Sequence, residues 1–149
     1  MRSCFSAHTI DFYSDNLQDI PLTMDGITLN CFVLRVLDGD TVELCLFNPY
    51  SNTGNLENIV KKRCRLMGIY APEIHTHDAK EKQKGLEAKY YLEKMIQGKT
   101  VKISFGKTDK YGRELGTIFF NGVNVNKLLM EKGLAREYFG LKKENWVFD

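Results

Sequence analysis

The periodicity of apolar residues predicts an α+β protein that is mainly β. Five short segments read as strands, with clear alternation of apolar side chains in two of them, and helical spacings of three and four replace this alternation in Gly85–Ile96. The resulting order is three strands, a helix, two strands and a helix. A five-stranded Greek-key barrel of the OB type, with two or three packed helices, has this order. Other α+β folds share it, so the barrel is a prediction from pattern alone.

The five predicted strands are short and rich in β-favouring residues. Asp38-Gly39 is a tight-turn signal between the first two strands. The polar segment Asn48–Glu57, which contains Pro, Gly and Asn, predicts a long loop after the second. The predicted strands are Thr28–Leu37, Thr41–Phe47, Ile59–Ile69, Thr100–Phe105 and Leu115–Phe120.

Two segments predict helices. In Gly85–Ile96 the apolar residues fall on one helical face, and Gly98 ends the pattern. Val125–Lys132 predicts a shorter helix that ends at Gly133.

Length and composition indicate a single folded domain over residues 28–149. The chain has 149 residues and is 43% hydrophobic, which is enough for a core. Residues 1–27 lack clear periodicity, and we expect an extension there, ordered as an arm rather than a mobile tail. No apolar run approaches the roughly 18 residues of a membrane span. The N-terminus also lacks the apolar stretch of a secretory signal, so we expect an intracellular, cytoplasmic protein without membrane contact.

Cysteine and histidine spacing gives little support for a metal site. The four cysteines form no CxxC pair. Cys31, Cys45 and Cys64 lie in predicted strands, where a buried reduced thiol is usual, although a disulfide among them stays open. His75 and His77 are paired metal-ligand types, but no third ligand stands at a recognisable spacing, which favours a polar loop.

The charge distribution indicates an anionic partner. Residues 1–60 carry two basic and eight acidic side chains, a net charge of −6. Residues 61–149 carry the remaining nineteen basic and eleven acidic side chains, a net charge of +8. A basic half of this kind suits nucleic acid.

Three short strings carry candidate chemistry. Asp38-Gly39-Asp40-Thr41 places two carboxylates where a hard cation such as Ca²⁺ or Mg²⁺ could bind, although a hairpin alone explains the string. Arg63 and Arg65 share one strand face, where arginines are usually solvated but suit bidentate phosphate contacts near acids. In Ala71-Pro72-Glu73 the proline stiffens the turn, and Glu73 is either a general base or an ordinary exposed glutamate.

A fourth string, Asp109–Arg113 (DKYGR), lies between the fourth and fifth predicted strands. Its two cations and one aromatic ring suit a phosphate clamp with a stacking surface. Taken alone, it is also consistent with an ordinary turn.

The order of these motifs resembles the staphylococcal nuclease (thermonuclease) family. A DGDT turn, an arginine-led strand ending in APE, a helix, DKYGR and a GxNVNxxL[LV]xxGLA segment follow one another over roughly residues 28–140. The matching pieces are Val36–Val42, Arg65–Glu73, Gly85–Ile96, Thr108–Arg113 and Gly122–Ala135.

The resemblance implies an OB-type barrel that hydrolyses phosphodiesters of DNA and RNA with Ca²⁺, with Mg²⁺ or Mn²⁺ as alternatives in this chain. It implies that Asp40 ligates the metal with Asp38 beside it, and that Glu73 positions or deprotonates the attacking water. Two arginines would hold the phosphate, and a lysine and a tyrosine would line the nucleotide site. These residues are Arg65, Arg113, Lys110 and Tyr111.

Three features depart from the family pattern. Tyr70 stands where the family usually has a second metal-binding aspartate, and a neutral phenol is a poor ligand for Ca²⁺. We therefore expect weaker Ca²⁺ binding, an altered metal preference, or ligation completed by waters and a backbone carbonyl. The segment between Asp40 and Arg65 is long. Glu137–Asp149 is too short for the family's long last helix, and only Lys142–Trp146 has room for a helical turn.

Tyr70 also favours an alternative function. Nuclease-like barrels with degraded sites occur in Tudor-containing proteins, where they act as nucleic-acid- or protein-binding modules. A degraded site is expected to lose its glutamate and arginines as well. Asp40, Arg65, Glu73 and Arg113 all remain in order here, which favours the nuclease.

Overall fold

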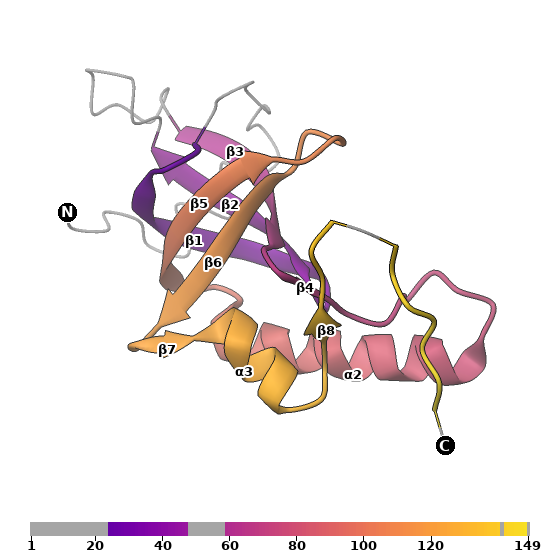
Figure 1. The fold of residues 1–149 in the computed structure, drawn as a ribbon. Helices are drawn as coiled ribbons and strands as arrows, with labels where there is room; N and C mark the ends of the chain where they lie inside the picture. The colour runs from indigo at the N-terminus through magenta and orange to yellow at the C-terminus, as the bar shows by residue number, and fades with distance from the viewer. Residues whose placement is uncertain (1–23, 48–58, 141, 149) are drawn as a thin grey trace.

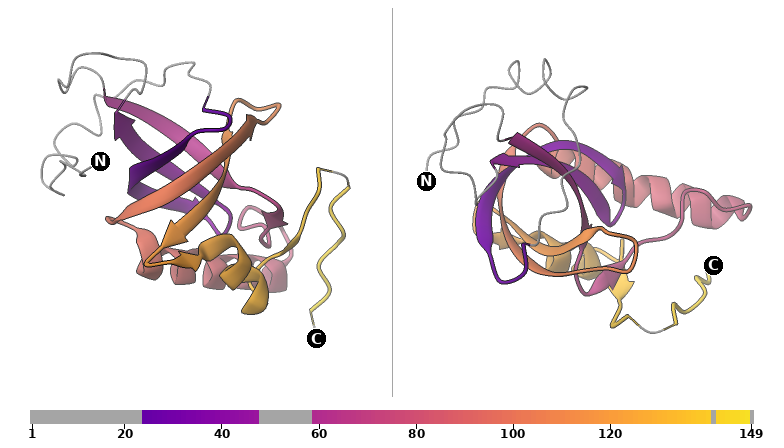
Figure 2. Two further views of the ribbon diagram at one scale, coloured as in Figure 1. Left: turned by 60° about the vertical axis from the view of Figure 1, so that its left-hand side comes forward. Right: turned by 90° about the horizontal axis from the view of Figure 1, so that it is seen from above.

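The computed structural model describes residues 24–47, 59–140 and 142–148, and its strands close into a small barrel (Figures 1 and 2). Neighbouring strands pair in the order β3-β2-β1-β5-β6, and a parallel pairing of β3 with β6 closes the ring. The barrel strands are β1 (Thr28–Asp38), β2 (Thr41–Phe47), β3 (Ile59–Leu66), β5 (Thr100–Thr108) and β6 (Glu114–Phe120). The predicted five-stranded OB-type barrel is confirmed.

Two helices and three short strands complete the described fold. Figure 1 shows α2 running beneath one end of the barrel with α3 beside it. Strand β7 extends the sheet from β6, and β4 pairs with β8 in a separate two-stranded sheet. Their bounds are β4 (Ile69–Tyr70), α2 (Ala79–Ile96), β7 (Val123–Asn124), α3 (Val125–Glu131) and β8 (Arg136–Glu137).

Alternation along the strands fills the barrel, as the sequence predicts. In β5, Val101, Ile103 and Phe105 are buried while Lys102 between them is exposed. The apolar face of α2 joins the same core through side chains that include Leu92. The main core cluster therefore fixes the helix against one end of the barrel.

The first helix begins six residues earlier than predicted. It starts at Ala79, after Asp78, whose side chain accepts hydrogen bonds from the backbone N–H groups of Lys80 and Glu81 at 2.9 and 3.2 Å. The six residues of α2 before Gly85 have the sequence AKEKQK, which contains no apolar residues at helical spacing. Apolar periodicity alone therefore predicts that the helix begins at Gly85. The N-cap aspartate, which satisfies two free helix N–H groups, was the available signal.

The third predicted strand, Ile59–Ile69, is divided into two strands in the structure. Strand β3 ends at Leu66, and β4 begins at Ile69 after a turn in which Gly68 has φ +80°. Glycine adopts this left-handed conformation without steric cost. The turn redirects the chain so that β4 pairs with β8 and carries Tyr70 and the following loop to the barrel rim.

Parts of the prediction fall outside the described residues. These are most of the 1–27 extension and the 48–57 loop. Met24, at the start of the described chain, is buried, and the N–H of Gly26 donates to the carbonyl of Phe105 at 3.0 Å. Cys31, Cys45 and Cys64 are buried free thiols, with pKa values raised by burial. None of the helices described is long and apolar enough to cross a membrane.

Candidate active site

The turn between β1 and β2 is packed tightly against α2 and the loop after β4. A Cβ atom on Gly39 would lie 2.6 Å from the Cβ of Ala71 and 2.7 Å from the Cβ of Ala88. Only glycine fits such a close approach, and Ala71 and Ala88 are themselves small. The string that predicts a hairpin therefore also fixes where Asp38 and Asp40 stand relative to the APE motif.

Asp40 links three segments of the rim. Its Oδ2 accepts a hydrogen bond from the backbone N–H of Ala71 at 2.8 Å, and its Oδ1 accepts one from the hydroxyl of Thr41 at 2.9 Å. The Nη2 of Arg65 lies 3.8 Å from Oδ2. Asp40 is only 8% exposed. The β1–β2 turn, β3 and the loop after β4 thus meet at one carboxylate.

Asp38 lies beside Asp40, and the negative charge of Asp40 disfavours ionisation of the Asp38 carboxyl group. Its Oδ1 accepts a hydrogen bond from the backbone N–H of Asp40 at 3.0 Å. Burial, followed by the negative charge of Asp40, raises the pKa of Asp38 to about 7. Two close carboxylates repel one another unless a proton or a cation lies between them.

Arg65 is a buried cation, and one of its guanidinium nitrogens makes no hydrogen bond in the described part of the chain. Its side chain is 7% exposed, and its guanidinium carbon lies 4.8 Å from the centre of the Tyr138 ring. Within the described residues its Nη2 makes no hydrogen bond. Buried donors are normally paired, so an unpaired guanidinium nitrogen at the rim is suited to an oxyanion such as phosphate.

Glu73 lies at the outer edge of the same rim. A Cβ on Gly85 of α2 would lie 2.6 Å from the carbonyl oxygen of Pro72, so glycine allows the loop to rest on the helix. The backbone N–H of Glu73 donates to Oε1 of Glu81 at 3.2 Å. Its own carboxylate accepts a hydrogen bond from Nζ of Lys143 at 3.3 Å. The backbone is thus fixed, while the side chain is 57% exposed.

Tyr70 faces the C-terminal residues. Its ring is buried, and its hydroxyl donates to the carbonyl oxygen of Glu144 at 3.1 Å. Its ring meets the edges of Tyr138 and Trp146, with centroids 5.8 and 5.5 Å apart. Tyr70, Glu73 and residues 143–146 share the walls of a pocket of about 410 Å³. Sequence reasoning missed Lys143 and Trp146, although Trp146 is the chain's only tryptophan.

The DKYGR string forms a self-contained hairpin loop between β5 and β6. Oδ1 of Asp109 accepts hydrogen bonds from the backbone N–H groups of Tyr111 and Arg113, at 2.9 and 3.0 Å. Oδ2 of Asp109 accepts one from Nε of Arg113 at 2.8 Å. Lys110 and Tyr111 are exposed, and Nζ of Lys110 lies 5.1 Å from the centre of the Tyr111 ring.

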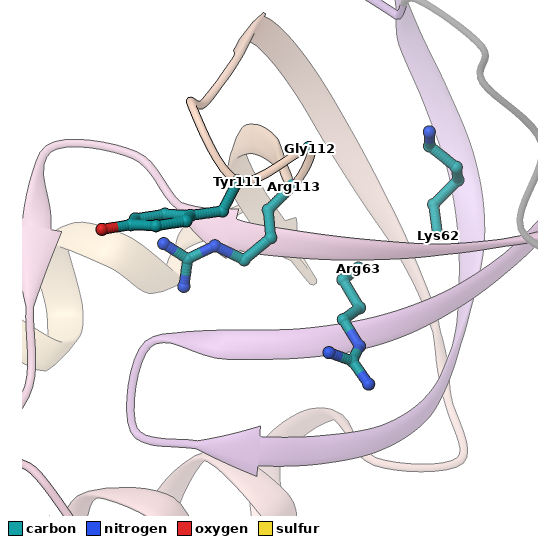
Figure 3. A pocket seen from close by; sticks show the side chains of 5 residues that line it. All are labelled: Lys62, Arg63, Tyr111, Gly112 and Arg113. Atoms are coloured by element: carbon teal, nitrogen blue, oxygen red, sulfur yellow. The ribbon is translucent and has the colours of Figure 1, made fainter.

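This loop borders a second pocket, of about 530 Å³ (Figure 3). Figure 3 shows the Arg113 guanidinium beside the Tyr111 ring, whereas Lys62 points away from both. Lys62 is buried and forms an ion pair with Glu114 at 3.3 Å. Strand β3 pairs with β6 through Cys64 with Glu114 and Arg65 with Leu115, so Arg65 near the end of β3 and Arg113 in the loop just before β6 lie at the same end of the barrel. They occupy different surroundings, one against Asp40 and the other against Asp109.

The donor set suits a divalent cation held by few protein ligands. Asp38 and Asp40 offer adjacent carboxylates, and their mutual repulsion would be relieved by a positive charge. No group of three or more His, Cys, Asp or Glu side chains able to hold a metal occurs in the described part of the chain. Mg²⁺ commonly uses one or two carboxylates and keeps several waters, whereas Ca²⁺ takes six to eight oxygen ligands. His75 and His77 are exposed loop residues.

A small closed barrel with carboxylates and a buried arginine at one rim defines a candidate phosphate-handling OB-type protein. Residues 63–146 match the family described as staphylococcal nuclease homologue. This is more than half of the chain, and the chain belongs to that family.

Several curated proteins are similar to this chain. An uncharacterized protein, MJ1439, of Methanocaldococcus jannaschii is 37% identical over 75% of this chain and 62% of its own length. A protein named as an uncharacterized endonuclease of Escherichia coli O157:H7 is 33% identical over 71% and 59% of the two chains. The staphylococcal-like nuclease CAN1 of Arabidopsis thaliana is 39% identical over 60% and 26%. The chain thus spans less than two thirds of the length of these relatives.

Proposed function

We propose that this chain is a metal-dependent nuclease that hydrolyses phosphodiester bonds of DNA, RNA or both. The observation that carries the proposal is Arg65, a buried guanidinium whose Nη2 lies 3.8 Å from Oδ2 of Asp40 and makes no hydrogen bond in the described part of the chain. Membership of the nuclease family and the endonuclease and nuclease names of two relatives support it. A fixed, partly desolvated cation that awaits an oxyanion lowers the barrier because it needs no reorganisation during the reaction.

Each residue of the rim then has a role. Asp40 and Asp38 would hold a divalent cation, which when bound would supply Lewis-acid polarisation of the phosphate. Water attacks phosphorus and its proton passes to the Glu73 carboxylate, while the P–O ester bond breaks and the leaving oxygen is protonated from solvent. The phosphate oxygens are held by Arg65 and Arg113. The nucleotide is contacted by Lys110 and Tyr111.

Cleavage assays with matched variants test this proposal. Wild-type protein, Glu73→Gln and Glu87→Gln are incubated with single-stranded DNA and RNA in Ca²⁺, Mg²⁺ or Mn²⁺. Glu87 is the control because it is a half-exposed carboxylate on α2 that pairs with Lys84 at 3.1 Å. We expect cleavage by the wild type and by Glu87→Gln, and a loss of about 10²-fold or more in Glu73→Gln. Undiminished cleavage by Glu73→Gln contradicts the proposed base.

Metal binding is tested separately by calorimetric titration. We expect Asp40→Asn to weaken binding of Mg²⁺ and Mn²⁺, because it removes one of two adjacent carboxylates. We also expect Tyr70→Asp to tighten Ca²⁺ binding by restoring a third carboxylate. Unchanged affinity in Asp40→Asn would place the metal elsewhere.

Tyr70 is the feature that favours a second function, a nucleic-acid- or protein-binding module. Its hydroxyl is already bonded to Glu144, so it supplies no metal ligand in this arrangement. Oligonucleotide binding without cleavage in any of the three metals would support the binding module over the nuclease.

A further inference from the structure

The residues from 142 to 148, here called the 142–148 segment, are anchored beside the APE motif. The main anchor is Trp146, whose ring lies 4.1 Å from the guanidinium carbon of Arg136 and 5.5 Å from the Tyr70 ring. The hydroxyl of Tyr70 adds a hydrogen bond to the backbone of Glu144. Figures 1 and 2 show this segment returning past β8 toward the loop between β4 and α2. Two aromatic contacts and a backbone hydrogen bond therefore fix its course.

Anchoring brings one side chain to the proposed general base. Nζ of Lys143 lies 3.3 Å from Oε1 of Glu73, and 5.8 and 5.9 Å from the ring centres of Tyr70 and Tyr138. Exposed ion pairs contribute little free energy when both side chains must be ordered for the purpose. Here the neighbouring anchors order the backbone at Lys143, so the contact orients Glu73 at a lower entropy cost.

We infer that the 142–148 segment is a working part of the active site, in which Lys143 is a positioning residue for Glu73. The inference rests on the proposed nuclease function and deepens it. Tyr70 then has a role of its own at the position of the family's second aspartate, because it holds the segment that carries Lys143. Tyr70 of β4 thus stands where the family usually has an aspartate, and the Lys143 cation from the C-terminal side lies beside Glu73.

The opposite role for the same contact is inhibition. An ion pair with Lys143 could occupy the carboxylate that must accept a proton from water, and the segment would then have to leave before catalysis. Positioning and inhibition predict opposite changes in kcat when the lysine charge is removed. A kinetic test therefore decides between them.

The first measurement reports docking of the segment without reference to activity. Trp146 is the only tryptophan, so intrinsic fluorescence reports its surroundings directly. We expect acrylamide to quench Trp146 more strongly in Tyr70→Phe than in the wild type, because the variant keeps the ring but loses the bond to Glu144. Equal quenching in the two proteins would show that Tyr70 does not hold the segment, and this would overturn the inference.

The second measurement tests positioning. In Lys143→Met we expect kcat for single-stranded DNA to fall by about three- to tenfold with KM changed less than about twofold, as for a misoriented catalytic group. Lys143→Arg should restore most of kcat because it keeps the cation. Lys142→Met is the matched control, since the adjacent lysine is also exposed and its removal changes the net charge equally.

The outcomes separate the two proposals. An unchanged kcat in Lys143→Met, or a fall in kcat no larger than that of Lys142→Met, overturns the positioning role while the nuclease proposal stands. A higher kcat in Lys143→Met overturns it in favour of inhibition. A wild-type protein that cleaves nothing in any metal refutes the nuclease function, and the positioning role with it.

Discussion

Arg65 and Arg113 are the two arginines expected to hold the phosphate, and the structure surrounds them differently. Arg65 is buried, lies on the face of Tyr138 and retains an unpaired Nη2. Arg113 is 29% exposed and donates to Asp109 within its own loop at 2.8 Å. Both guanidinium groups have a carboxylate neighbour, but Arg65 is buried and its Nη2 lies 3.8 Å from Asp40 without a hydrogen bond, whereas Arg113 is more exposed and is hydrogen-bonded to Asp109.

The different surroundings suggest different roles: Arg65 suits stabilisation of the transition state, and Arg113 suits binding of the substrate. A group that is fixed in advance acts most strongly where charge develops, because nothing has to reorganise. A more exposed arginine that shares a carboxylate adds to the attraction for the nucleic-acid backbone, which is screened by salt. We therefore expect Arg65 to determine mainly kcat and Arg113 to determine mainly KM.

The largest effect is expected from Arg65→Lys. The substitution keeps the positive charge but removes the planar fork that can hold two phosphate oxygens. We expect kcat to fall by about 10²-fold, the usual cost of losing one fixed donor at a developing oxyanion. Steady-state kinetics measure this, with Arg35→Lys as the control because Arg35 is an exposed arginine paired with Glu43. A loss confined to KM would contradict the assignment.

A smaller effect is expected from Arg113→Lys. Loss of the guanidinium should raise KM by about fivefold or less with kcat nearly unchanged, since an exposed charge contact contributes up to about 1 kcal/mol. The same kinetic assay with single-stranded DNA measures both constants. A fall in kcat as large as that of Arg65→Lys would show that the two arginines act alike.

The two arginines also show what sequence can and cannot predict. Arg65 and Asp40 are predicted as site residues from the order of the short strings that contain them, which resembles a known family, whereas each string alone is consistent with an ordinary strand or hairpin turn. The barrel followed from alternation, since a period of two aligns with burial in strands such as β5. Local patterns of this kind survive folding because neighbouring residues determine them.

Long-range contacts were not predictable from pattern. Lys143 meets Glu73 across 70 positions of sequence, and nothing near either residue marks the pairing. Gly39 was expected to form a turn, but its close approach to Ala88 depends on where α2 packs. The different surroundings of Arg65 and Arg113 belong to the same class, because burial is set by the closed barrel.

The smallest effect is expected from Asp109→Asn. This substitution removes the negative charge that pairs with Arg113 and leaves Arg65 unaltered. Asparagine retains an oxygen for the two backbone N–H groups of the loop, so the hairpin should keep its shape. Loss of the carboxylate charge frees Arg113 for phosphate, and KM should fall about two- to threefold. The dependence of KM on salt should also steepen, because one more protein cation releases counterions from the nucleic acid. In the Arg113→Lys background, adding Asp109→Asn should change KM less than it does in the wild-type protein. A higher KM in Asp109→Asn alone would mean that the carboxylate orients Arg113 for the substrate rather than competing with it.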